Sequence, residues 1–147
     1  MSASRFAVSA AFVMLSLLAA RPAPGEEVEE VKWTKDVEAA WKTTIEQQRH
    51  MLIYVTTDKC KFCRLMESKT FSDPGIAAQI NKSFIAVTLY AKGEGSRLVK
   101  VLGVKTFPTT LVISYDKKLI DTIKGYLPAD EMKVRLASAV SKKPAPR

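Results

Sequence analysis

The two cysteines of this 147-residue chain, Cys60 and Cys63, are separated by only two residues. At this spacing their sulfur atoms can meet across the first turn of a helix and form or break one disulfide bond. A disulfide that closes so short a loop restricts the unfolded chain very little, because its entropic contribution to stability grows with loop length. We therefore interpret the pair as a site of reversible redox chemistry rather than as a structural crosslink.

Metal binding is an alternative function for the pair. A structural zinc ion needs four protein ligands, and the two cysteines together with His50, the single histidine of the chain, make three. We therefore expect no metal at this site. We place His50 at the protein surface, near the end of a helix.

The first 25 residues have the pattern of an export signal. Arg5 precedes 15 uncharged residues, 6–20, a run that is short for a membrane span, and small residues and prolines follow it. This pattern is typical of a secretory signal peptide, cleaved between Ala20 and Gly25, with an uncleaved N-terminal anchor as the alternative. Export predicts a periplasmic or secreted protein. Such proteins commonly carry disulfides between distant cysteines, and the lack of a distant pair here favours the redox interpretation.

The rest of the chain has the length of one domain. We expect a flexible acidic lead-in over residues 26–32, a folded domain over residues 33–140 and a disordered basic tail over residues 141–147. The net charge is +8, from 23 basic and 15 acidic residues. Nucleic-acid binding is not expected, because the basic residues form no stripe with interleaved aromatic residues. A solvated basic surface is the simplest interpretation, with weak attraction to anionic membranes or acidic partners as the alternative.

Apolar periodicity predicts helices that alternate with strands. The expected helices cover residues 35–48 with Thr34 as N-cap, residues 60–68, a segment opened by Pro74, residues 96–103, and a segment opened by Pro128 with Met132, Leu136 and Val140 facing inward. The expected strands cover residues 51–57, 84–90, 109–115 and 118–124, and the last two form a hairpin. Strands separated by helices predict parallel pairing, and the hairpin predicts an antiparallel edge. The fold class is therefore α/β, with a central mixed sheet and helices on both of its faces.

Cys60 stands where a strand ends and a helix begins, and this position favours a thiolate. Unpaired backbone N–H groups and the helix dipole stabilise negative charge there, and Lys59 and Lys61 add positive charge beside it. Because the thiolate is the reactive form of cysteine, we expect Cys60 to be the nucleophile, with a lowered pKa. Cys63 lies one turn further along the helix and is expected to be more buried. It is then the resolving thiol, which attacks the mixed disulfide and releases the substrate.

Three features together resemble the thioredoxin family: the Cys60–Cys63 pair after an apolar strand, the Phe107-Pro108 step at the start of another strand, and Gly125 after the last strand. The resemblance covers residues 33–140. The stretch from Cys63 to residue 74 is most similar to exported thioredoxin-like domains, which include the C-terminal domain of the bacterial thiol–disulfide interchange protein. The resemblance implies the three-layer thioredoxin fold, Cys60 as nucleophile, Cys63 as resolving thiol and Pro108 as the cis proline of a substrate groove.

The groove implied by this resemblance is expected to include Phe62, Phe107 and Pro108. A proline at the start of a strand cannot donate a hydrogen bond to its neighbour. A cis bond before Pro108 would bring the backbone of Phe107 against the cysteine pair. The N–H and C=O groups of Phe107 would then stay free for an extended substrate chain.

The sequence departs from the usual thioredoxin pattern at three positions. Thioredoxins usually carry tryptophan before the first cysteine, and this chain has Lys59. They also place a buried aspartate in the preceding strand and a lysine in the next strand, and those positions here hold Tyr54 and Thr88. The usual assistance to proton transfer at Cys63 is therefore missing, unless Asp58 or Glu67 reaches this thiol through water.

The expected function is that of an exported thiol–disulfide oxidoreductase acting on protein substrates, with no cofactor besides the Cys60–Cys63 disulfide. Reduction of substrates, with electrons from a separate membrane protein, is the favoured direction because of the family resemblance. Lys59 and Lys61 stabilise the reduced thiolate, so we expect a higher reduction potential than that of a housekeeping thioredoxin. A monomer is expected. The alternatives are a disulfide oxidase or isomerase, and a non-catalytic module that binds peptides in the groove.

Overall fold

The computed structural model describes residues 29–142. The expected signal peptide, the first part of the lead-in and most of the basic tail lie outside the described residues. Within residues 29–142, no helix has both the length and the apolar character that a membrane span requires.

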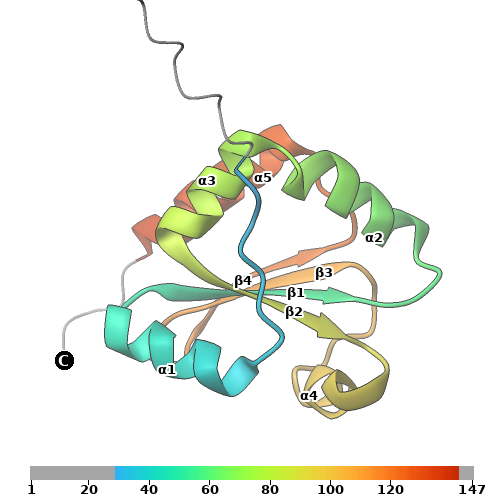
Figure 1. The fold of residues 1–147 in the computed structure, drawn as a ribbon, viewed down its shortest axis with the longest axis horizontal. Helices are drawn as coiled ribbons and strands as arrows, with labels where there is room; N and C mark the ends of the chain where they lie inside the picture. The colour runs from blue at the N-terminus through green and yellow to red at the C-terminus, as the bar shows by residue number, and fades with distance from the viewer. Residues whose placement is uncertain (1–28, 143–147) are drawn as a thin grey trace, which may run out of the picture.

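Helices and strands alternate along the described chain in the expected order (Figure 1). The helices are α1 (Val37–Gln47), α2 (Lys61–Leu65), α3 (Pro74–Ser83), α4 (Ser96–Val101) and α5 (Ala129–Ser141). The strands are β1 (His50–Thr56), β2 (Phe84–Tyr90), β3 (Thr109–Ile113) and β4 (Leu119–Lys124). A π-helical turn, Met66–Phe71, continues α2, and a 3₁₀ turn, Gly93–Gly95, precedes α4.

The four strands form one mixed sheet in the order β2-β1-β3-β4. β1 and β2 are parallel, whereas β3 is antiparallel to both of its neighbours. The expectation of parallel pairing was therefore right for β1 and β2 and wrong for β3. α4 does not carry the chain back across the sheet, so β3 starts at the edge where β1 ends, with Thr109 beside Val55.

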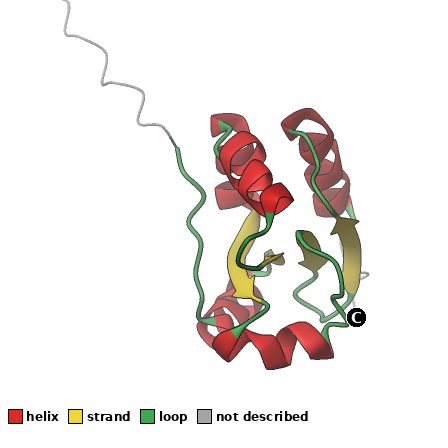
Figure 2. Ribbon diagram, turned by 90° about the vertical axis from the view of Figure 1, so that its right-hand side faces the viewer, coloured by secondary structure: helices red, strands yellow, loops and turns green. Residues whose placement is uncertain are grey.

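Helices cover both faces of this sheet (Figures 1 and 2). α2, α3 and α5 lie on one face, called here the upper face, and α1 and α4 lie on the lower face. Successive side chains of a strand point to opposite faces, and β1 follows this rule. Leu52 and Tyr54 belong to the upper core, while Ile53 and Val55 belong to the lower core. The expected three-layer thioredoxin-like architecture is confirmed.

The lead-in is part of the fold from Val31 onward. Val31 is buried in the upper core, although it was expected in a flexible segment. Thr34 pairs with the outer edge of β2 through its backbone N–H and C=O, which bond to Ala86 O at 3.0 Å and Thr88 N at 2.9 Å. Because Thr34 is held in this bridge, α1 starts later than expected. Asp36 is its N-cap and accepts a hydrogen bond from Ala39 N at 2.9 Å.

Two further expectations were wrong. His50 is buried, because it is the first residue of β1 and is paired with Phe84 of β2. Val140 is 41% exposed, and Ala139 takes its place in the core with Met132 and Leu136. Seven residues bring a helix almost back to the same face, whereas eight rotate it by about 80°, so Ala139 aligns with Met132 and Val140 does not.

Candidate active site

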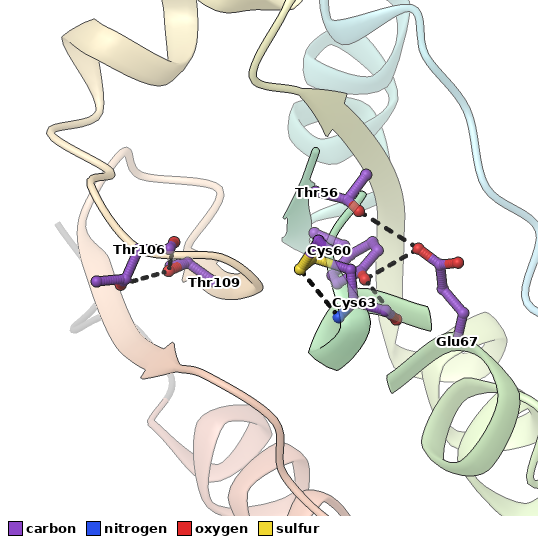
Figure 3. The surroundings of a disulfide bond; sticks show 7 residues. Thr56, Cys60, Cys63, Glu67, Thr106 and Thr109 are labelled. Atoms are coloured by element: carbon purple, nitrogen blue, oxygen red, sulfur yellow. Dashed lines mark hydrogen bonds between the residues drawn. A yellow bond between two sulfur atoms is a disulfide. The ribbon is translucent and has the colours of Figure 1, made fainter. Parts of the chain in front are cut away.

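A disulfide bond joins Cys60 and Cys63 at the amino end of α2, and their Cα atoms are 5.2 Å apart (Figure 3). Cys60 is the N-cap of the helix, and its Sγ accepts a hydrogen bond from Cys63 N at 3.1 Å. Cys63 is 1% exposed, whereas Cys60 is partly exposed. One sulfur is therefore accessible from outside and the other lies in the interior.

The two lysines beside Cys60 are exposed. Lys59 has a left-handed backbone, with φ of 56°, in the turn between β1 and α2. Lys61 is the first residue of α2. Water and salt screen exposed charges of this kind, so the hydrogen bond from Cys63 N is the more direct stabilisation of a thiolate at Cys60.

A hydrogen-bond network lies beneath the buried cysteine. The hydroxyl of Tyr54 donates to Glu67 Oε1 at 3.0 Å and lies 3.2 Å from the carbonyl oxygen of Cys63. Thr56 Oγ1 donates to the same carboxylate oxygen at 3.4 Å. Burial raises the pKa of Tyr54, so its hydroxyl stays protonated and remains a donor. Of the two carboxylates considered from the sequence, Glu67 is the one linked to Cys63.

Asp58 does not take part in this network. Its side chain is exposed and lies 4.0 Å from Lys92 Nζ. Glu67 follows Cys63 by four residues, which is one helical turn, so the spacing could have identified it before the structure did. Tyr54 could not be identified in that way, because its role depends on the placement of α2 above β1.

Two aromatic side chains, Trp33 and Phe71, hold Tyr54 in position. The ring of Tyr54 is 4.9 Å from that of Phe71 and 5.7 Å from that of Trp33, and the Trp33 and Phe71 rings are 5.0 Å apart. A cavity of about 250 Å³ is lined by these residues together with Glu67 and Thr88. It has room for water, so the Glu67 carboxylate can exchange protons with solvent. Trp33 and Phe71 were not expected to take part in the site.

The second part of the site is the segment that leads into β3. The Phe107–Pro108 peptide bond is cis, as expected. Thr109 pairs with Val55 near the end of β1, so this segment lies at the same edge of the sheet as the cysteines (Figure 3). The carbonyl of Pro108 accepts a hydrogen bond from Gly125 N at 2.7 Å. Gly125 has φ of 84°, a conformation that glycine adopts without strain.

The three candidate substrate-binding residues differ in exposure. Phe62 is 56% exposed, while Pro108 is buried. The ring of Phe107 packs against the lower core, so its backbone rather than its ring is available to a partner. Within residues 29–142, the N–H and C=O groups of Phe107 make no hydrogen bond. In the same range, no group of three or more histidine, cysteine, aspartate or glutamate side chains is arranged to hold a metal ion.

The family model of a thioredoxin-like domain matches residues 37–139. The chain therefore belongs to the thioredoxin-like family, and its fold and cysteine pair are those of a thiol–disulfide oxidoreductase. No curated protein matched the sequence.

Several solved structures have the same fold. A thioredoxin from Thermus thermophilus has a TM-score of 0.70 at 19% identity, covering 78% of this chain and 90% of that one. The DsbH oxidoreductase has a TM-score of 0.66 at 14% identity, covering 83% and 92%. The reduced C-terminal domain of DsbD from Neisseria meningitidis has a TM-score of 0.59 at 20% identity, covering 69% and 91%. The expected likeness to the interchange protein's C-terminal domain is thus confirmed for the fold.

Proposed function

We propose that this protein is an exported thiol–disulfide oxidoreductase that reduces disulfides of protein substrates through Cys60 and Cys63. The unequal exposure of the two sulfurs supports this proposal most directly. A substrate disulfide can reach Cys60, while Cys63, at 1% exposure, can react only with a sulfur already attached to Cys60. This arrangement suits a nucleophile and a resolving thiol.

The reaction has two steps in the proposed direction. The Cys60 thiolate attacks a substrate disulfide, forms a mixed disulfide and releases one substrate thiolate. Cys63 then loses its proton and attacks Cys60 Sγ, which forms the Cys60–Cys63 disulfide and releases the second substrate thiolate. The substrate gains two electrons, and a dithiol of a second protein must return two electrons to the pair.

The backbone of α2 favours the first step. The hydrogen bond from Cys63 N to Cys60 Sγ stabilises negative charge on the outer sulfur. In the second step, Glu67 and Tyr54 are the polar side chains linked to Cys63. We assign to Glu67 the uptake of the Cys63 proton by way of water, since Tyr54 links this carboxylate to the backbone carbonyl of Cys63.

The direction of transfer, the export and the partners rest on the family resemblance and on the N-terminal sequence. We propose a periplasmic or secreted monomer that receives electrons from a membrane protein. Its reduction potential is expected to be higher than that of a housekeeping thioredoxin. The equilibrium with glutathione measures this potential, and a value as low as that of thioredoxin contradicts the expectation.

Substitution of each cysteine tests the mechanism. Cys60→Ser is expected to abolish the acceleration of insulin-disulfide reduction over the rate with dithiothreitol alone. Cys63→Ala is expected to accumulate mixed disulfides with substrates, because the resolving step is lost. The Cys60→Ser/Cys63→Ala protein is the matched control and traps nothing. If Cys63→Ala captures no protein from a periplasmic extract, the proposal of protein substrates is wrong.

A non-catalytic peptide-binding module is the second candidate. The pairing of Tyr54 with Thr88 in neighbouring strands favours it, because these positions lack the aspartate and lysine expected of a thioredoxin. Such a module would bind at Phe107 and Pro108 without exchanging disulfides. Insulin reduction that is no faster than with dithiothreitol alone would favour the module. An oxidase or isomerase is distinguished by its activity on reduced or scrambled ribonuclease.

A further inference from the structure

The lower face of the sheet carries an open groove beneath β3 and β4. α1 packs against β1 and β2, and α4 packs at the end of β2. With six residues, α4 is about 9 Å long, and a five-residue strand spans about 17 Å. A helix this short leaves part of the face open, and a cavity of about 620 Å³ lies there.

The floor of the groove is a row of paired side chains from the two strands. The register joins Thr109 to Lys124, Leu111 to Thr122 and Ile113 to Leu119. The segment from Val101 to Thr106 forms the wall. Leu119 is 62% exposed and Val101 is 76% exposed. Exposed apolar side chains gathered in one concave surface are typical of a binding site.

The charged residues that line the groove are all lysines. Lys105, Lys117 and Lys124 line it, and no aspartate or glutamate does. The three lysines are exposed, and none forms an ion pair within residues 29–142. Lys117 belongs to the hairpin at one end, while Lys124 is paired with Thr109 at the other. The groove is therefore complementary to a ligand with negative charges at separate points along its length.

The outer edge of β4 is less open to a partner than the groove is. Asp121 Oδ1 accepts a hydrogen bond from Thr122 N at 2.8 Å, and Arg135 Nε donates to Asp121 Oδ2 at 2.8 Å. Arg135 Nη2 also reaches Thr122 O at 3.5 Å. Both backbone groups of Thr122 are thus occupied, and an added strand would lose hydrogen bonds at the middle of this edge.

We infer that the groove docks an extended segment of a partner protein that carries apolar side chains and at least two acidic residues. A second copy of this chain is disfavoured, because the net charge is +8 and the groove itself is basic. A single fatty acid fits less well, since one carboxylate cannot meet lysines at both ends. An acidic segment satisfies both the apolar floor and the separated charges.

The groove reaches the edge of the proposed active site. Thr106 and Thr109 line it and stand on either side of Phe107 and Pro108. A partner bound in the groove would therefore hold its neighbouring residues close to Cys60. That the partner then reacts at Cys60 rests on the proposed function, whereas binding in the groove requires no cysteine chemistry.

A labelled synthetic peptide without cysteine tests the binding directly. It is about ten residues long, alternates leucine with glutamate and is followed by fluorescence anisotropy. We expect saturable binding that weakens when salt is raised from about 0.05 M to about 0.5 M. A peptide with lysine in place of glutamate should not bind. Lys117→Glu/Lys124→Glu should weaken binding by about tenfold or more, because attraction becomes repulsion.

Further variants distinguish the contributions of the groove's charge and apolar contacts from general effects of substitution. Leu119→Ser should weaken binding by about fivefold through loss of apolar contact. Lys124→Arg should retain it, because the charge remains. Lys82→Glu, a single charge reversal in α3 on the upper face, should leave it unchanged.

Three results would overturn the inference. The first is that the acidic peptide fails to bind or binds the doubly reversed variant equally well. The second is that dodecanoate binds the groove and the peptide does not. The third is self-association of the free protein that Lys117→Glu/Lys124→Glu abolishes. Cys60→Ser should bind the peptide normally. If the unsubstituted protein binds the peptide but reduces insulin no faster than dithiothreitol alone, the redox function is contradicted and the binding inference stands.

Discussion

The hydroxyl of Tyr54 donates a hydrogen bond to the carboxylate of Glu67 at 3.0 Å, directly beneath the redox pair. The same hydroxyl lies 3.2 Å from the carbonyl oxygen of Cys63. A carboxylate from the active-site helix is thereby coupled to the buried cysteine through a strand residue. Thioredoxins usually place an aspartate at the strand position itself. In this chain the strand residue is Tyr54, and the carboxylate belongs to Glu67 in the helical segment after Cys63.

Glu67→Gln tests the electrostatic effect of this carboxylate. A nearby negative charge raises the pKa of a thiol. Replacing Glu67 with glutamine should therefore lower the thiol pKa that is measured from the pH dependence of alkylation of the reduced protein by iodoacetamide. We expect a small decrease, because Glu67 is exposed and water screens its charge.

Tyr54→Phe is the companion variant. It removes the hydroxyl and keeps the ring between Trp33 and Phe71. The oxidised protein should lose about 1 kcal/mol in its free energy of unfolding in urea. An unchanged alkylation profile in Glu67→Gln together with unchanged stability in Tyr54→Phe would show that the network has no role.

Lys59→Gln/Lys61→Gln tests the contribution of the exposed lysines to the redox potential. Loss of two positive charges destabilises the Cys60 thiolate, so the reduction potential should fall. Because both side chains are exposed, we expect a decrease of about 10 mV at low salt, measured against glutathione. The effect should shrink as salt is added, and Lys82→Gln serves as control. A shift that is the same at high salt would argue against a charge effect.

His50 is expected to make the stability depend on pH. Burial lowers its pKa from 6.5, with Asp116 acting in the opposite direction. The unfolded chain then takes up a proton near pH 6.5, while the folded chain stays neutral at His50. The free energy of unfolding should therefore fall as the pH is lowered from about 6.5. His50→Phe should flatten this slope, because the chain has no other histidine.

The Asp121–Arg135 pair provides an internal comparison. The hydrogen bond from Arg135 lowers the pKa of Asp121 from 3.8. The ionised Asp121 therefore stabilises the folded protein above pH 3.8, and this contribution is lost only as the pH falls further. Urea unfolding of His50→Phe and Asp121→Asn, followed from above pH 6.5 to below pH 3.8, separates the pH dependence caused by His50 from that caused by Asp121. A slope near pH 6 that persists in His50→Phe contradicts the assignment to His50.

Thr70→Val probes the contact between the π-helical turn and the loop before α5. The fully buried Thr70 donates from Oγ1 to Leu127 O at 2.6 Å. Valine keeps the shape and leaves that carbonyl without this donor, so the free energy of unfolding should fall by about 1 to 3 kcal/mol. Ser72→Ala removes a similar bond at an exposed site, from Ser72 Oγ to Ser68 O, and should have little effect. Equal losses in both variants would contradict the importance of burial.

The sequence predicts most of the fold because its local patterns are clear. Apolar periodicity locates the helices and strands, and the phase of α5 shows its limit, since Ala139 and Val140 are both plausible until the helix is docked. Periodicity does not determine strand direction, and for this reason the expected orientation of β3 was wrong. His50 was misplaced because its burial depends on the residue at which β1 begins.

The placement of the cysteine pair and of the cis proline was predictable, and the surroundings of the candidate site were less so. Cys60, Cys63 and Pro108 stand in recognisable local patterns. The contacts of Trp33, Tyr54 and Phe71 join three separate segments of the chain, and no local pattern reports them. The groove under β3 and β4 depends on the length of α4 relative to these strands, which only the assembled structure reveals.

The two outer strands are occupied where an extra strand would join. Thr34 covers the middle of β2, and the side chains of Asp121 and Arg135 engage the backbone of Thr122 in β4. If the protein acts on protein disulfides, as proposed, it meets incompletely folded chains, and an open sheet edge is a template for pairing with such chains. With both edges occupied, a substrate held at Cys60, as proposed, could be released again without having paired as a fifth strand of the sheet.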